Sequence, residues 1–138
     1  MESESEMKKT YRGSCHCGAV RFEADTDLAS GTFKCNCSIC FKSRAWLAGV
    51  PASGFRLIAG EQNLRDYQFG KKRLHHFFCM QCGVRPFSRG VDQKGQENYA
   101  IRVNCLDGVD EKEFVDAPVR YFNMAHDDMK PPAETRHL

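Results

Sequence analysis

The sequence has no long hydrophobic run and little net charge, and each of these absences argues against a class of protein. Its unbroken apolar stretches span only a few residues, whereas a transmembrane helix needs about 20. The 20 basic and 18 acidic side chains leave a formal net charge of +2, which attracts nucleic acid only weakly. The N-terminal residues lack the apolar core of a signal peptide. We therefore expect a cytoplasmic protein that binds no membrane and for which nucleic acid is a disfavoured partner.

A long amphipathic helical pattern is also missing from the chain. Short alternating segments and turn residues instead recur about every 8–12 residues, which predicts a mainly β fold with little helix. One helical turn is expected over residues 38–44, with Ser38 as its cap. The predicted strands are residues 19–24, 32–35, 45–50, 55–58, 64–69, 74–78 and 99–104.

What the sequence does have is eight cysteines, seven of them in three tight clusters. Cys15 and Cys17 form one C-x-C pair, and Cys79 and Cys82 form a C-x-x-C pair. Two such pairs supply the four sulfurs of a closed tetrahedral zinc site, which stabilises a fold rather than performing chemistry. Gly follows the second cysteine of each pair and takes a positive φ at low cost, as a zinc knuckle requires.

The third cluster has three cysteines, Cys35, Cys37 and Cys40. Three sulfurs on one loop leave the fourth position of a zinc ion to water or substrate, which is the arrangement of a catalytic site. We therefore expect two Zn²⁺ ions per chain, one structural and one catalytic. The alternative is a second structural site with a fourth protein ligand, for which the candidates are His75, His76 and Cys105.

Two other uses of the cysteines fit the sequence less well than zinc binding does. Disulfides would need an oxidising compartment, and C-x-C pairs are too close to bridge comfortably. A thioredoxin-like redox role for Cys79 and Cys82 would need a βαβ pattern nearby, and none precedes them.

Basic residues near the clusters predict a positively charged environment for an anionic substrate, although the Lys71–Arg73 run is also typical of a solvated loop. These basic residues are Lys34, Lys42, Arg44 and Arg85.

The length of 138 residues fits one domain. We predict a disordered tail over residues 1–9, a single zinc-binding β domain over residues 10–126 and a loosely held tail over residues 127–138.

Three ordered motifs resemble one known family. They are Gly13–Glu23 (GSCHCGAVRFE), Cys35–Cys40 (CNCSIC) and Phe78–Phe87 (FCMQCGVRPF). Over residues 11–123 the chain is similar to the glutathione-dependent formaldehyde-activating enzyme family, which includes centromere protein V. It departs from the usual family pattern at Tyr121–Met124, where many members have Asp-Gly, and this difference would alter the edge of the pocket.

The resemblance implies a fold, a set of ligands and a reaction. The fold would be a β-tent of antiparallel sheets pinned by zinc. Cys15, Cys17, Cys79 and Cys82 would hold the structural zinc, and the remaining three clustered cysteines would hold the catalytic zinc. The reaction would be that of a carbon–sulfur lyase, which joins or splits glutathione or a similar thiol and a small aldehyde such as formaldehyde. The alternative is a non-catalytic zinc scaffold that binds a protein or nucleic-acid partner. The sequence leaves the oligomeric state open.

Overall fold

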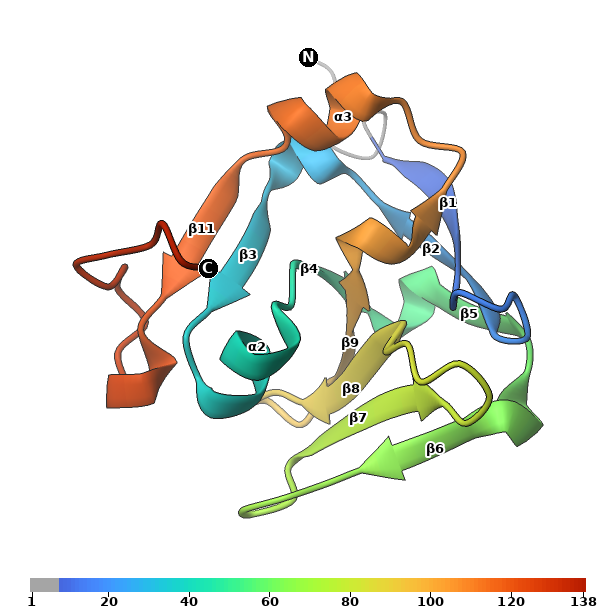
Figure 1. Cartoon of the computed structure of the whole chain (residues 1–138), viewed down its shortest axis with the longest axis horizontal. Coiled ribbons are helices and arrows are strands. Elements are labelled where there is room, and N and C mark those ends of the chain that lie inside the picture. The colour runs from blue at the N-terminus through green and yellow to red at the C-terminus, as the bar shows by residue number, and fades with distance from the viewer. Residues whose placement is uncertain (1–7) are drawn as a thin grey trace.

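A computed structural model describes residues 8–138 and arranges them in two β-sheets (Figure 1). The predicted tail over residues 1–9 falls mainly on residues 1–7, which lie outside the described part. The first strand begins at Lys9. No helix of the described residues is long and apolar enough to cross a membrane.

The smaller sheet has four strands in the order β10-β1-β2-β5, all antiparallel to their neighbours. These strands are β1 (Lys9–Ser14), β2 (Arg21–Thr26), β5 (Phe55–Ala59) and β10 (Leu106–Asp107).

The larger sheet has seven strands in the order β11-β3-β4-β9-β8-β7-β6. Its pairs are antiparallel except for the parallel pair of β11 and β3 at one edge, so the sheet is mixed. The strands are β3 (Thr32–Cys35), β4 (Leu47–Pro51), β6 (Leu64–Tyr67), β7 (Leu74–Cys79), β8 (Phe87–Val91), β9 (Glu97–Arg102) and β11 (Val119–Phe122).

Helix is confined to short segments, and the predicted mainly β class is confirmed. Within residues 8–138, the two α-helices are α2 (Ser38–Ser43) and α3 (Glu111–Asp116). Single 3₁₀ turns occupy Leu28–Ser30, Ala52–Gly54, Glu61–Asn63, Val103–Cys105 and Met124–His126. The helical turn expected near residue 38 is present, but its N-cap is Cys37 and not Ser38. Cys37 makes no side-chain cap hydrogen bond.

The core lies between the two sheets and is built on stacked aromatic rings. Phe22 of β2 stacks on Phe55 of β5 with ring centroids 5.6 Å apart, and Phe55 stacks on Tyr99 of β9 at 3.9 Å. Phe87 of β8 lies 4.7 Å from Phe55. Rings from both sheets therefore meet at Phe55, which fixes how the sheets pack.

The last residues of the chain turn back toward helix α2 (Figure 1). Lys34 and Arg44 each donate a hydrogen bond to the backbone oxygen of Leu138, at 3.4 and 3.3 Å. The ring of His137 lies 5.7 Å from that of Phe41. The division into tail and domain at residue 127 stays a prediction.

Candidate functional site

The two cysteine pairs come together at one point although they lie far apart in the sequence. Ligand atoms of Cys15, Cys17, Cys79 and Cys82 all lie within 4.8 Å of one another, close enough to hold one metal ion. The Cys17 and Cys79 sulfurs are 3.7 Å apart and come from positions 62 residues apart. The cluster therefore joins the turn after β1 to the turn after β7, and so ties the smaller sheet to the larger one.

Both turns of this cluster have the same backbone geometry. Gly18 and Gly83 each have a φ of 79°, as the sequence predicted for residues that follow a knuckle. The amide of Gly18 donates to the oxygen of Cys15 at 3.1 Å, and the amide of Gly83 donates to the oxygen of Cys79 at 2.8 Å. Backbone amides also point at the sulfurs, and the Val84 amide is the main reason that the pKa of Cys82 falls to about 6. The turn after β7, which lowers the pKa of both Cys79 and Cys82, thus favours the thiolate form that a metal needs.

The second cluster contains Cys35, Cys37 and Cys40, also within 4.8 Å of one another. Cys35 ends strand β3, Cys37 caps helix α2 and Cys40 lies in its first turn. Hydrogen bonds from the other two thiols, Cys35 first, lower the pKa of Cys37, while the same contacts raise the pKa of Cys40. The cluster therefore favours a thiolate at Cys37, to which its neighbours donate.

None of the three candidates for a fourth ligand joins this trio among the described residues. His75 faces away, and its Nδ1 lies 2.5 Å from the carboxylate of Asp66. Cys105 approaches the backbone oxygen of Arg85 at 3.9 Å instead. His76 lines the same cavity as the trio but is not within 4.8 Å of its sulfurs. His75 and His76 are adjacent on strand β7 and therefore point to opposite faces, so only one of them can face the trio.

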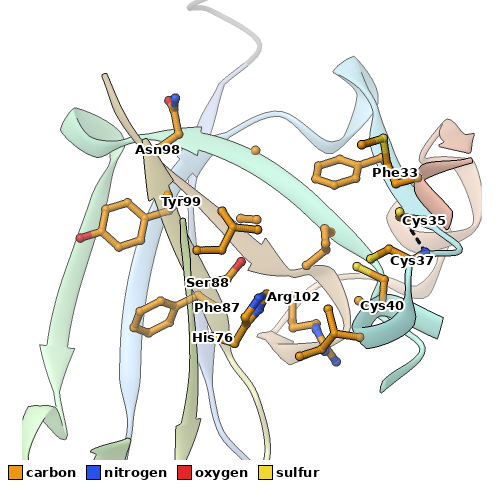
Figure 2. Close-up of a pocket in the computed structure, with 18 of the residues that line it drawn as sticks. Phe33, Cys35, Cys37, Cys40, His76, Phe87, Ser88, Asn98, Tyr99 and Arg102 are labelled. Carbon is orange, nitrogen blue, oxygen red and sulfur yellow. Dashed lines mark hydrogen bonds between the residues drawn. The ribbon is translucent and has the colours of Figure 1, made fainter. Parts of the chain in front are cut away.

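The trio opens into a cavity of about 640 Å³ that one face of the larger sheet supports (Figure 2). Small residues occupy neighbouring positions on this face: Gly49 of β4 pairs with Ala100 of β9, and Ala100 pairs with Ser88 of β8. A Cβ atom added at Gly49 would have no neighbour within 4 Å. The lack of bulk on these strands therefore leaves the space open.

Apolar side chains form most of the cavity wall. They come from β3, α2, β4 and β7 to β9, from the end of β11 and from the segment that follows it. Phe122 at the end of β11 and Met124 after it line the cavity, so the departure from the family pattern noted at Tyr121–Met124 lies at the cavity wall. The main apolar members of the lining are Phe33, Ile39, Leu47, Leu74, Phe77, Phe87, Val91, Tyr99, Phe122, Met124 and Met129.

Only one of the four predicted basic residues lines the cavity. Lys34 and Arg44 donate to the backbone of Leu138, and Lys42 is exposed on α2. Arg85 lines the cavity, as does Arg102, which the sequence analysis missed. The sequence pattern could have identified Arg102, because it stands between the apolar residues Ile101 and Val103 and therefore lies on the face of the strand opposite the core.

The polar side chains on the sheet point toward the trio. Figure 2 shows His76, Ser88 and Arg102 on the side of the cavity that faces Cys37 and Cys40. Arg102 donates to Ser43 Oγ at 3.0 Å, which ties β9 to the helix that carries Cys40. Burial, and then the positive charge of Arg85, lower the pKa of His76 below its usual value of 6.5. This lowering favours the neutral imidazole, which can both donate and accept a hydrogen bond.

Two comparisons with known proteins agree on the relatives of this chain. The family model for the glutathione-dependent formaldehyde-activating enzyme matches residues 10–123. The crystal structure of a Rhodobacter sphaeroides protein superposes with a TM-score of 0.66 at 32% sequence identity. This match covers 78% of the present chain and 98% of the other one.

Proposed function

Because the chain belongs to the glutathione-dependent formaldehyde-activating enzyme family, we propose that it is a zinc-dependent carbon–sulfur lyase. It joins or splits a thiol, glutathione or a similar one, and a small aldehyde. In the joining direction, the thiol sulfur bonds to the aldehyde carbon, and the thiol proton ends on the former carbonyl oxygen. No atom is lost and no oxidant is needed. We propose that this reaction takes place in the cytoplasm, where thiols stay reduced.

The observation that carries the proposal is the difference between the two cysteine clusters. One has four sulfurs and ties two sheets together, while the other has three and opens into a cavity. All seven donors are thiols, which suit Zn²⁺. We assign the structural zinc to Cys15, Cys17, Cys79 and Cys82 and the catalytic zinc to Cys35, Cys37 and Cys40. Zinc bound by the trio would offer one free coordination position, at which it can stabilise a thiolate or polarise a carbonyl group.

The remaining roles belong to side chains of the cavity. Arg102 holds helix α2 through Ser43 and so keeps Cys40 in place. His76 is uncharged at neutral pH, because burial and Arg85 lower its pKa. It is the titratable group best suited to move the proton between the thiol sulfur and the carbonyl oxygen. The apolar wall excludes water and so protects the adduct from exchange.

The test is the rate at which the protein interconverts formaldehyde hydrate and its glutathione adduct, measured by NMR exchange. We expect the zinc-loaded protein to accelerate this exchange over the uncatalysed rate, and Cys40→Ser to abolish the acceleration. Elemental analysis of both proteins reports the number of zinc ions per chain, which we expect to be two in the unchanged protein. Binding of the thiol without acceleration would leave a thiol-binding protein with another aldehyde partner. If no thiol binds, a zinc scaffold for a macromolecular partner is the better explanation.

A further inference from the structure

The cavity contains a positive charge that no described residue neutralises. Arg85 forms no ion pair among residues 8–138. Its Nη1 atom is buried and has no hydrogen-bond partner in the part of the chain that the structure describes. A buried donor left unpaired costs about 1–3 kcal/mol, and more when it is charged. Such a group is unusual in a stable fold unless a ligand completes its interactions.

The guanidinium of Arg85 is also held in place. It lies 5.8 Å from the ring centroid of Tyr67 on β6 and 5.8 Å from that of Phe78 on β7. Both rings can stabilise the cation through their faces without satisfying its N–H groups. Arg85 is therefore a positioned donor on the cavity lining, not a mobile surface side chain.

The second arginine of the cavity has other partners. Arg102 donates to Ser43 Oγ at 3.0 Å and to the backbone oxygen of Ser43 at 3.5 Å, on the helix that carries Cys40. Three thiolates and one Zn²⁺ would carry a net charge of about −1, and Arg102 offsets this charge. The charge of Arg85 is left for a ligand. Arg85 lines the same cavity as the trio, so an anion bound to it would share that cavity with the metal site.

The rest of the cavity suits an apolar body better than a peptide. Glutathione carries two carboxylates and one ammonium, so it needs an acidic partner as well as basic ones. Asp92 is the only acidic side chain lining the cavity, within the part of the chain that is described. Its Oδ1 accepts from the amides of Lys94 and Gln96, and its Oδ2 accepts from the side chain of Asn98. The remaining wall is aromatic and aliphatic.

We propose that Arg85 binds a carboxylate of the substrate and that the site prefers a thiol with one anionic group and an apolar body over glutathione. That the substrate is a thiol rests on the proposed function. That it carries one anionic group and an apolar body rests on Arg85 and the cavity wall.

The first experiment measures binding to the zinc-loaded protein by calorimetry, with probes that contain no sulfur. 3-Phenylpropanoate carries the anion and the apolar body, and 3-phenylpropanamide has the same body without the charge. We expect the carboxylate to bind at least tenfold more tightly than the amide. Equal affinities of the two probes, or no binding of either, would overturn the proposal without any reference to catalysis.

Variants then assign the effect to one side chain. Arg85→Met should reduce the preference for the carboxylate to less than twofold, and Arg85→Lys should restore part of it. Arg89→Met is the matched control, because Arg89 pairs with Glu97 and does not line the cavity. Arg89→Met removes a positive charge four residues from Arg85 and should leave the preference for the carboxylate over the amide unchanged. A preference that survives in Arg85→Met, with an unchanged melting temperature, would contradict the assignment.

The final comparison uses thiols. We expect 2-mercapto-3-phenylpropanoate to bind at least tenfold more tightly than glutathione, and tighter binding of glutathione would overturn the preference. The lyase reaction is scored separately by NMR exchange. If the protein prefers the carboxylate probe but does not accelerate the exchange between aldehyde and thiol adduct, the proposed function alone is rejected. If it accelerates the exchange but binds glutathione more tightly than the other thiols, the present inference alone is rejected.

Discussion

Gly60 shows at the scale of one residue how tightly the sheets are joined. It has a φ of 92°, and a Cβ atom at this position would lie 2.1 Å from the backbone oxygen of Ala19. Ala19 belongs to the segment between Cys17 and strand β2, so the close approach lies beside the four-cysteine cluster. The backbone cannot move away without disturbing that cluster.

We predict that Gly60→Ala lowers the free energy of unfolding by about 2–4 kcal/mol. Gly95→Ala is the control, because Gly95 also has a positive φ, 79°, but nothing lies within 4 Å of its added Cβ. The control should cost only the roughly 1–2 kcal/mol of the left-handed backbone. Urea denaturation of the zinc-loaded proteins measures both. Equal losses would show that the contact with Ala19 relaxes freely.

His76 gives a second prediction at this scale. Burial first, and then the charge of Arg85, lower its pKa, so the imidazole should titrate below the usual value of about 6.5. Arg85→Met removes the second cause and should move the titration midpoint upward. NMR titration of the imidazole Cε1 proton follows the midpoint in both proteins. A midpoint that does not move would mean that Arg85 and His76 are electrostatically independent.

At the scale of the elements, the cavity exists because neighbouring strands carry small residues on one face. Gly49 of β4 and Ala100 of β9 are paired, and the space above Gly49 is open. The opposite face of the same strands packs into the core through Val50 and Ile101, which are 1% and 0% exposed. One sheet therefore serves as core wall and cavity floor.

We predict that Gly49→Val fills part of the cavity and weakens binding of 3-phenylpropanoate at least tenfold. The melting temperature should stay close to that of the unchanged protein, because the added Cβ atom has no neighbour within 4 Å and Val favours strands. Gly49→Ala should have a much smaller effect on binding. Calorimetry and thermal melting measure the two properties. Undiminished binding in Gly49→Val would place the ligand elsewhere.

At the scale of the whole molecule, the two cysteine clusters have different structural roles. The four-cysteine cluster joins positions 62 residues apart and connects both sheets. The trio spans only the end of β3 and the start of α2. Metal at the first cluster is therefore coupled to folding of the whole domain, and metal at the second is coupled to one loop.

We predict two zinc ions per chain that differ in resistance to chelators. Elemental analysis during a chelator titration should show one zinc lost early, with the fold retained, and one lost only on unfolding. Cys79→Ser should give aggregated or poorly soluble protein, whereas Cys40→Ser should melt nearly like the unchanged protein and lack activity. If both metals are lost together, or if Cys40→Ser lowers the stability as much as Cys79→Ser, the assignment of one structural and one catalytic zinc site is rejected.

Local pattern was sufficient for much of the fold. The prediction for residues 32–35 matches strand β3, and alternation found most of β2, β5 and β7 within one or two residues. Strands β1, β8, β10 and β11 and helix α3 were not predicted. Short segments carry little local signal, and β11 is held by its parallel pairing with β3, in which Val119 lies opposite Thr32.

The cysteines by themselves determined which residues form each cluster, because thiols two or three residues apart must share a turn and metal chemistry requires three or four of them at one point. The sequence also identified Arg85, yet it could not separate this residue from Lys34, Lys42 and Arg44. Which of these four side chains lines the cavity depends on how the strands and loops that carry them pack together. The positions of Arg102 and His76 beside the trio depend on the same packing. Only the tertiary structure decided these points, since the pairing of β7, β8 and β9 brings their polar faces together, and Nη1 of Arg85 has no hydrogen-bond partner among the described residues.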